Sequence, residues 1–191
     1  MVFSSLPFLF FFLPATLILY FLMPQKGKNA VLLIVSLLFY GYGEPVYILL
    51  MIGSILLNYV SGLLLGKFDG SAKKRKAVLV ICVILNLSLL GFFKYASLFV
   101  STIKVLPVFS FLPDPQIALP IGISFYTFQS MSYVIDTYRR NCAPQKNVVT
   151  FGTYVALFPQ LIAGPIVRYV DVEKQLQHRT HSMEKFSNGV R

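Results

Sequence analysis

Residues 45–66 have the sequence PVYILLMIGSILLNYVSGLLLG, which contains no charged side chain. A helix needs about 20 mostly apolar residues to cross the hydrocarbon core of a bilayer. This stretch has that length and that composition. It therefore predicts a membrane-spanning helix, and the rest of the chain is interpreted outward from it.

The whole chain has the same apolar character. Of its 191 residues 56% are hydrophobic and only 13% are charged, and the mean hydropathy is +0.70. A soluble domain has about a quarter of its residues charged. The composition excludes a soluble globule, and it equally excludes disordered, collagen-like and disulfide-stapled secreted chains. It predicts an all-α, multi-pass integral membrane helical bundle of about five to six spans.

Uncharged stretches mark the expected spans within a transmembrane region of residues 1–169. Residues 1–25 carry no charge. A cleavable signal peptide is not indicated, because no Lys or Arg precedes the apolar core and no small-residue cleavage site follows it. We expect this first stretch to be retained. The expected spans lie near residues 6–23, 29–43, 45–66, 77–97, 116–136 and 147–167. Helix-breaking Pro and Gly residues predict that the last of them is broken or re-entrant. A polar segment, 170–191, follows.

The positively charged residues lie mainly between the expected spans, as is typical of membrane proteins. The net charge is +10, and the Lys and Arg residues gather in the first, third and fifth gaps between spans. Such a pattern predicts that the N-terminus lies outside and that these gaps face the cytoplasm. Because the placement already explains the charge, we expect the lipid bilayer as a partner and no nucleic acid.

Nothing in the sequence predicts a metal or a bound cofactor. His178 and His181 are three residues apart, but no Cys or carboxylate lies at ligand spacing beside them, so solvent-exposed histidines are expected. Cys82 falls inside a span and Cys142 in a cytoplasmic gap, so we expect free thiols. Neither a Ser-His-Asp order nor a phosphate-binding glycine loop is present.

One face of the third span carries small and polar residues. Ser54, Asn58, Gly62 and Gly66 are four residues apart, which places them on one side of a helix. Small residues let a neighbouring helix approach, and an Asn can form a hydrogen bond across the interface. Helix packing is therefore the favoured interpretation, and Asn86 in the next span is interpreted in the same way.

The fifth span has a polar stripe. At 100° per residue about one third of the helical wheel holds Gly122, Phe125, Tyr126, Gln129, Ser132, Tyr133 and Asp136. Exposing these groups to lipid would be costly. The stripe is expected to form either an interhelical seam, with Asp136 paired to Arg139 or Arg140, or the wall of a cavity. The sixth span is broken, and Gln160 lies between Pro159 and Pro165. A polar pocket and a simple kinked helix are equally compatible with this segment.

Three segments carry a family resemblance. They are LPIGISFYTFQ (119–129), SYVIDTYR (132–139) and FPQLIAGPIVR (158–168), and LFYGY (38–42) with Asn58-Tyr59 fits the same pattern. Together they resemble the N-terminal half of the membrane-bound O-acyltransferases, in the bacterial branch of alginate O-acetylases and D-alanyl transfer proteins.

The resemblance implies an enzyme of the bacterial cytoplasmic (inner) membrane. Such an enzyme moves an acyl group, typically acetyl, from a cytoplasmic thioester such as acetyl-CoA to a hydroxyl of an extracytoplasmic polysaccharide such as alginate, often with a partner transferase outside. The family's catalytic histidine lies in the C-terminal half. We therefore expect a fragment without catalytic residues, which supplies the following pocket residues: Tyr126, Gln129, Ser132, Tyr133, Asp136, Pro159, Gln160, Gly164 and Pro165. A transporter of polysaccharide or lipid-linked sugar, or an inactive truncated product, is the alternative.

Overall fold

The computed structural model describes residues 5–103, 119–163 and 167–177, together with Arg179, Ser182 and Ser187. Over these residues all the regular secondary structure is helical, which confirms the predicted all-α class. The elements are η1 (a π-helix, Phe8–Phe12), α1 (Leu13–Leu22), α2 (Lys28–Gly43), α3 (Ile48–Lys67), α4 (Ala72–Ile103), α5 (Ile123–Tyr138), α6 (Val148–Ala156), α7 (Phe158–Ala163) and α8 (Tyr169–Gln177).

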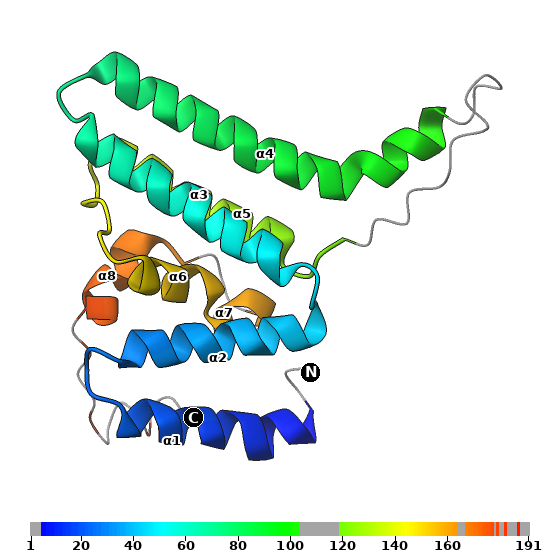
Figure 1. The fold of residues 1–191 in the computed structure, drawn as a ribbon, viewed down its shortest axis with the longest axis vertical. Coiled ribbons are helices and arrows are strands. Elements are labelled where there is room, and N and C mark those ends of the chain that lie inside the picture. Colours follow the sequence, from blue (N-terminus) through cyan, green and yellow to red (C-terminus); the bar gives the residue numbers. More distant parts are fainter. Residues whose placement is uncertain are drawn as a thin grey trace.

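The long helices lie side by side, and successive helices cross the molecule in alternating directions (Figure 1). From one edge to the other the order is α1, α2, the short helices α6 to α8, then α3 with α5, and finally α4. The beginnings of α2, α4 and α6 and the ends of α3 and α5 all lie on one side of the molecule. The basic gaps of the sequence therefore share a side, and which side of a membrane this is stays a prediction.

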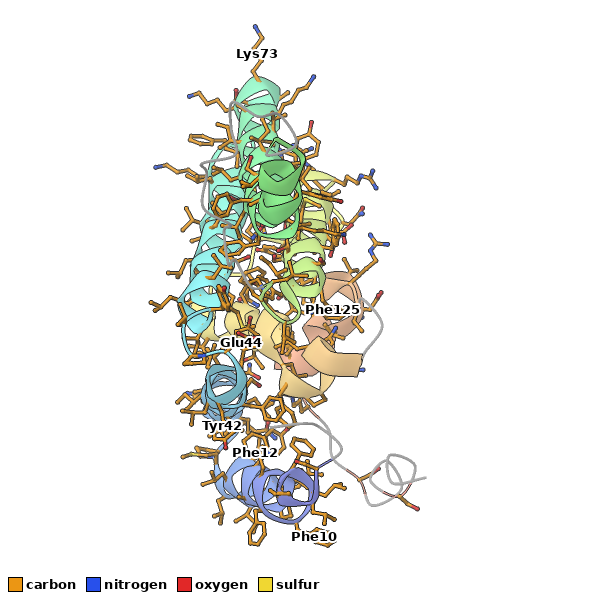
Figure 2. All side chains as sticks on the ribbon, turned by 90° about the vertical axis from the view of Figure 1, so that its right-hand side faces the viewer. Phe10, Phe12, Tyr42, Glu44, Lys73 and Phe125 are labelled. Atoms are coloured by element: carbon orange, nitrogen blue, oxygen red, sulfur yellow. The ribbon has the colours of Figure 1, made fainter. Side chains whose placement is uncertain are left out.

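In the part of the chain that the structure describes, two helices are long and apolar enough to cross a membrane, judged by length and composition alone. They are α3, with a mean hydropathy of 2.2, and residues 72–96 of α4, with 2.3. The apolar helices Phe8–Leu22, Lys28–Gly43 and Val148–Leu161 are shorter. Apolar side chains such as Phe10 and Tyr42 project from the outer surface, while Lys73 projects beyond the start of α4 (Figure 2).

The helices differ from the expected spans at two places. α4 begins before residue 77 and continues past 97, so its first turn carries the lysines of the third gap. α5 begins at Ile123 and not near 116, because Pro120 and Gly122 lie in the turn that precedes it, and the Gly122 φ of +75° is not helical. Residues 116–118 lie outside the described residues.

The sixth apolar stretch turns back on itself. It forms α6 and α7, which are separated by a bend at Leu157, and Pro159 lies in the first turn of α7. After α7 the chain returns to the side from which α6 started: the Tyr154 hydroxyl donates to the Val167 carbonyl at 2.9 Å, and the Gln145 amide donates to the Tyr169 hydroxyl at 2.7 Å. The stretch therefore leaves and rejoins the same side of the molecule.

Two separate groups of side chains form the interior. The larger one joins α3, α4, α5, α6 and α8 and also includes Tyr40 of α2 and Leu161 of α7. The smaller one, here the phenylalanine cluster, consists of Phe8, Phe12, Phe39 and Phe158, whose ring centroids lie 5.2 to 5.9 Å apart. This cluster attaches η1 to α2 and α7.

Candidate functional site

The polar stripe of α5 is buried in the larger interior group. Tyr126, Gln129 and Tyr133 are 0% exposed and Asp136 is 2% exposed, while Ser132 is half-buried. The stripe therefore faces protein and not the surroundings. The contacts of each side chain decide between the two interpretations, a seam and a cavity wall.

Asp136 pairs with Arg168, a residue that follows the bend of α6 and α7. The Arg168 Nε donates to one carboxylate oxygen at 3.2 Å, its Nη2 donates to the other, and the Asn141 amide donates at 3.1 Å. The hydrogen bond and the charge of Asp136 raise the pKa of Arg168, which keeps the guanidinium charged. This ion pair fixes the returning chain to the end of α5.

The expected pairing of Asp136 with Arg139 or Arg140 is wrong. Both arginines follow the last turn of α5 and are exposed, whereas the Asp136 side chain lies on the buried face. Arg140 has a φ of +65° and reaches Asp69 in the turn after α3, at 3.0 Å. A partner three or four residues away is favoured only while the helix continues, and α5 ends at Tyr138.

Tyr133 connects three helices. Its ring lies 4.6 Å from that of Phe151 and 5.0 Å from that of Tyr169, and its hydroxyl accepts the backbone N–H of Gln145 at 2.9 Å. A methyl group built on Gly62 would lie 2.5 Å from the Tyr133 hydroxyl oxygen. The small residue in α3 therefore allows α5 to approach, as the four-residue spacing predicted.

Gln129 joins α5 to α6. Its Nε2 donates to the Tyr154 carbonyl at 2.8 Å, whereas the Ser132 hydroxyl donates within its own helix to the Gln129 carbonyl at 2.7 Å. Seen with the contacts of Asp136 and Tyr133, these bonds form a packed interhelical seam along α5. The geometry therefore favours the seam interpretation for this helix.

The structure separates the residues that the sequence grouped into one pocket. A methyl group built on Gly122, at the start of α5, would lie 3.6 Å from the Leu161 carbonyl, so α7 packs at that end. Asp136 is almost four turns further along, roughly 21 Å. Pro159 is exposed, and the Gln160 Nε2 is buried without a hydrogen-bond partner among the described residues. Gly164 and Pro165 lie outside the described residues, as do His178 and His181.

Asn58 forms a hydrogen bond across a helix interface, as the sequence predicted, and the structure shows that its partner is Asn86 in α4. Asn58 and Asn86 are both 0% exposed and exchange two hydrogen bonds, at 3.0 and 3.1 Å. Cys82 lies beside them, with its Sγ 3.4 Å from the Asn58 oxygen. Cys82 and Cys142 are free and buried, and burial raises the pKa of the Cys142 thiol.

Sequence reasoning missed Arg75, which it counted only as part of a basic gap. This side chain is 6% exposed, and its guanidinium donates to carbonyls at the ends of two other helices: Leu65 at 3.1 Å, Thr137 at 3.1 Å and Tyr138 at 2.7 Å. It also pairs with Asp69. One signal was available: Arg75 is the single arginine in a run of lysines, and a planar guanidinium can bridge several acceptors where an ammonium cannot.

No protein-family model and no solved structure matches the chain. Curated proteins do. The chain is 42% identical over 193 residues to the probable alginate O-acetylase AlgI of Pseudomonas aeruginosa, a match that covers 99% of this chain and 37% of that protein. The namesake protein of Azotobacter vinelandii is also 42% identical, with 99% and 38% covered. The peptidoglycan O-acetyltransferase of Helicobacter pylori is 30% identical over 217 residues, with 98% and 41% covered. The chain thus spans about two fifths of the length of these relatives.

Proposed function

We propose, on the premise that this chain is homologous to alginate and peptidoglycan O-acetylases, that it is the N-terminal part of a membrane-bound O-acyltransferase. In this proposal the enzyme moves an acetyl group from a cytoplasmic thioester, such as acetyl-CoA, to a hydroxyl of an extracytoplasmic polysaccharide. The chain lies in the bacterial inner membrane with its N-terminus outside. A partner transferase on the outer side is a further part of the proposal.

The observation that carries the proposal is the homology over nearly the whole chain. The fold is consistent with the membrane placement. α4 leaves most of its apolar surface uncovered, as a helix in contact with lipid would, since only 17% of its apolar window is buried. Several polar side chains of α5, among them Asp136 and the Nε2 of Gln129, find hydrogen-bond partners inside the protein, as the absence of water in a bilayer favours.

Acyl transfer to a hydroxyl needs a base that takes the proton and donors that stabilise the oxyanion. We propose that both groups are supplied by protein outside this chain. The share of this chain is then to hold the α6–α7 bend in place, through Asp136 with Arg168 and through Gln129 with Tyr154. Gln160, whose buried Nε2 has no hydrogen-bond partner among the described residues, is the residue of the bend best suited to meet a substrate hydroxyl.

A chimaera tests the proposal. The homologous stretch of the Pseudomonas aeruginosa protein is replaced by this chain, and the chimaera is produced in a strain that lacks its own alginate O-acetylase. We expect exported alginate to carry O-acetyl esters, and we expect Asp136→Ala to lower the ester content or the amount of protein in the membrane. A chimaera present at the normal level that yields only unacetylated alginate would contradict the proposal. A loss of exported polymer with unchanged acetylation would instead indicate a transporter.

The membrane orientation has its own test. In a variant without Cys82 and Cys142, single cysteines are placed at Lys73, in the first turn of α4, and at Glu44, which follows α2. In intact cells an impermeant thiol reagent should label the cysteine at 44 and not that at 73. The reverse labelling would overturn the proposed orientation and leave the acyltransferase proposal untouched.

A further inference from the structure

Two adjoining hollows lie where the turn between α3 and α4 meets the end of α5. Their volumes are about 470 and 440 Å³. Asp69, Arg75 and Arg140 line both hollows, and Arg139 and Tyr138 complete the wall of the first. These residues belong to the side of the molecule on which the basic gaps gather. Neither hollow contains a residue of the predicted pocket.

The arginines of the first hollow differ in what they already bind. Arg75 is committed to the carbonyls of Leu65, Thr137 and Tyr138 and to Asp69. Within the described part of the chain Arg140 donates through its Nη2 alone, to the carboxylate of Asp69 at 3.0 Å and to the carbonyl of Asp69 at 3.3 Å, and its side chain is 67% exposed. Arg139 is exposed and has no ion-pair partner among the described residues. Two guanidinium groups therefore have donors available at one opening.

The charge balance of the first hollow is positive. Three arginines face a single carboxylate, that of Asp69, and Arg75 already binds this carboxylate from inside. The backbone of Arg140 is held at a φ of +65°, a conformation that costs a non-glycine residue about 1 kcal/mol or more. This turn directs the Arg140 side chain back over α3–α4, so that it shares the opening with Arg139. A doubly charged oxyanion complements such an arrangement.

We propose that Arg139 and Arg140 bind a phosphate group at the mouth of this hollow. Guanidinium groups bind phosphate through paired N–H donors, which makes arginine the preferred residue for this task. The phosphate belongs either to the acyl-thioester donor, if that is coenzyme A, or to the headgroup of an anionic lipid. The inference rests on the proposed function only for the first of these two sources.

The test uses the 191-residue chain in nanodiscs of phosphatidylcholine. The binding variant is Arg139→Gln with Arg140→Gly, in which Gly suits the positive φ and keeps the turn intact. The control variant, Lys26→Gln with Lys146→Gln, removes the same charge from two exposed residues that do not line the hollows. One measurement is the equilibrium binding of radiolabelled coenzyme A. The other is native mass spectrometry of the phosphatidylglycerol retained when that lipid is mixed into the nanodisc.

We expect the binding variant to lose about tenfold in one of the two measurements, while the control changes less than about twofold. A loss confined to coenzyme A identifies the donor as the source of the phosphate, and a loss confined to phosphatidylglycerol identifies the lipid. If the binding variant equals the unmodified chain in both measurements, or if the control loses as much, the proposal is overturned. Neither measurement depends on acyl transfer, so a failed chimaera would leave this result intact.

Discussion

Helices α4 and α5 are opposites in composition and in position. The apolar window of α4 has a mean hydropathy of 2.3 and is 17% buried, and its Ile81 and Ile84 are 57% and 56% exposed. The polar stripe of α5 carries an amide, a carboxylate and two phenols, yet these side chains are only 0 to 2% exposed. The more apolar helix lies at the edge, and the more polar helix lies in the middle.

This arrangement is the reverse of that in a water-soluble protein. In water, the hydrophobic effect would bury α4 and leave the polar side chains at the surface. In a bilayer an apolar helix gains little by leaving lipid, whereas every polar group must find a partner inside the protein. The comparison predicts that hydrogen bonds, ion pairs and close helix packing in the interior determine the stability of the protein. It also predicts that the outer face of α4 contributes little to that stability. The following substitutions test it, from the largest expected effect to the smallest.

Replacing Arg75 should have the largest effect. Arg75→Met removes hydrogen bonds to three carbonyls, which belong to the ends of α3 and α5, and we expect the free energy of unfolding to fall by about 3 kcal/mol or more. Unfolding in mixed micelles, followed by circular dichroism, measures the loss. Lys76→Met, in the same turn of α4 but exposed, is the matched control and should change stability by less than about 0.5 kcal/mol. Equal effects would show that Arg75 does not connect the helices.

Arg168→Gln should rank second. It leaves the Asp136 carboxylate buried, with Asn141 as its remaining donor, and we expect a clear loss of stability that is smaller than the loss for Arg75→Met, because the Arg168 side chain is half exposed. The same unfolding assay applies. Arg139→Gln, which changes the partner expected from the sequence, should be neutral. A larger loss of stability for Arg139→Gln than for Arg168→Gln would support the pairing of Asp136 with Arg139 that was expected from the sequence.

A methyl group on Gly62 should cost about 1 to 3 kcal/mol, because it overlaps the hydroxyl of Tyr133, which the Gln145 N–H holds in place. Gly53→Ala in the same helix is the control. No atom lies within 4 Å of the added methyl there, and alanine favours the helix, so stability should rise slightly. Thermal unfolding of both variants in one detergent provides the comparison. If the two substitutions have the same effect, α3 and α5 are not in close contact.

The smallest effect is expected on the outer face of α4. Ile84→Ala should change the free energy of unfolding in a lipid nanodisc by less than about 0.5 kcal/mol, since the side chain exchanges lipid contacts for lipid contacts. Leu90→Ala, on the buried face of the same helix, is the contrasting variant and should cost clearly more. A cost of 2 kcal/mol or more for Ile84→Ala would show that protein, and not lipid, covers this face.

The sequence predicted the features that depend on local periodicity. The helical class, the buried stripe of α5, the hydrogen bond of Asn58 across a helix interface and the resemblance to alginate O-acetylases are confirmed. Each of them follows from residues repeated at three or four positions along one helix, or from a contiguous motif. The membrane spans, the orientation and the pocket residues stay predictions.

Contacts between distant residues could not be predicted in this way. Asp136 binds a residue 32 positions later, and Arg75 binds carbonyls 62 and 63 positions later. Both depend on how the α6–α7 bend and the end of α5 pack, which a helical wheel does not contain. The same packing separates Gln160 from Asp136. From the sequence, both residues were expected to line one pocket, because Gln160 lies at a helix break and Asp136 in the polar stripe.

The bend between α6 and α7 also changes how the topology of the chain must be counted. A hydropathy profile scores residues 147–167 as one crossing, yet Arg168 contacts Asp136, and Tyr169 contacts Gln145 on the side where the stretch began. A reporter domain fused after Gln177 should therefore occupy the same compartment as one inserted beside Lys146. Counting this stretch as a full passage would reverse the assigned sidedness of every helix that comes after it in a longer homologue.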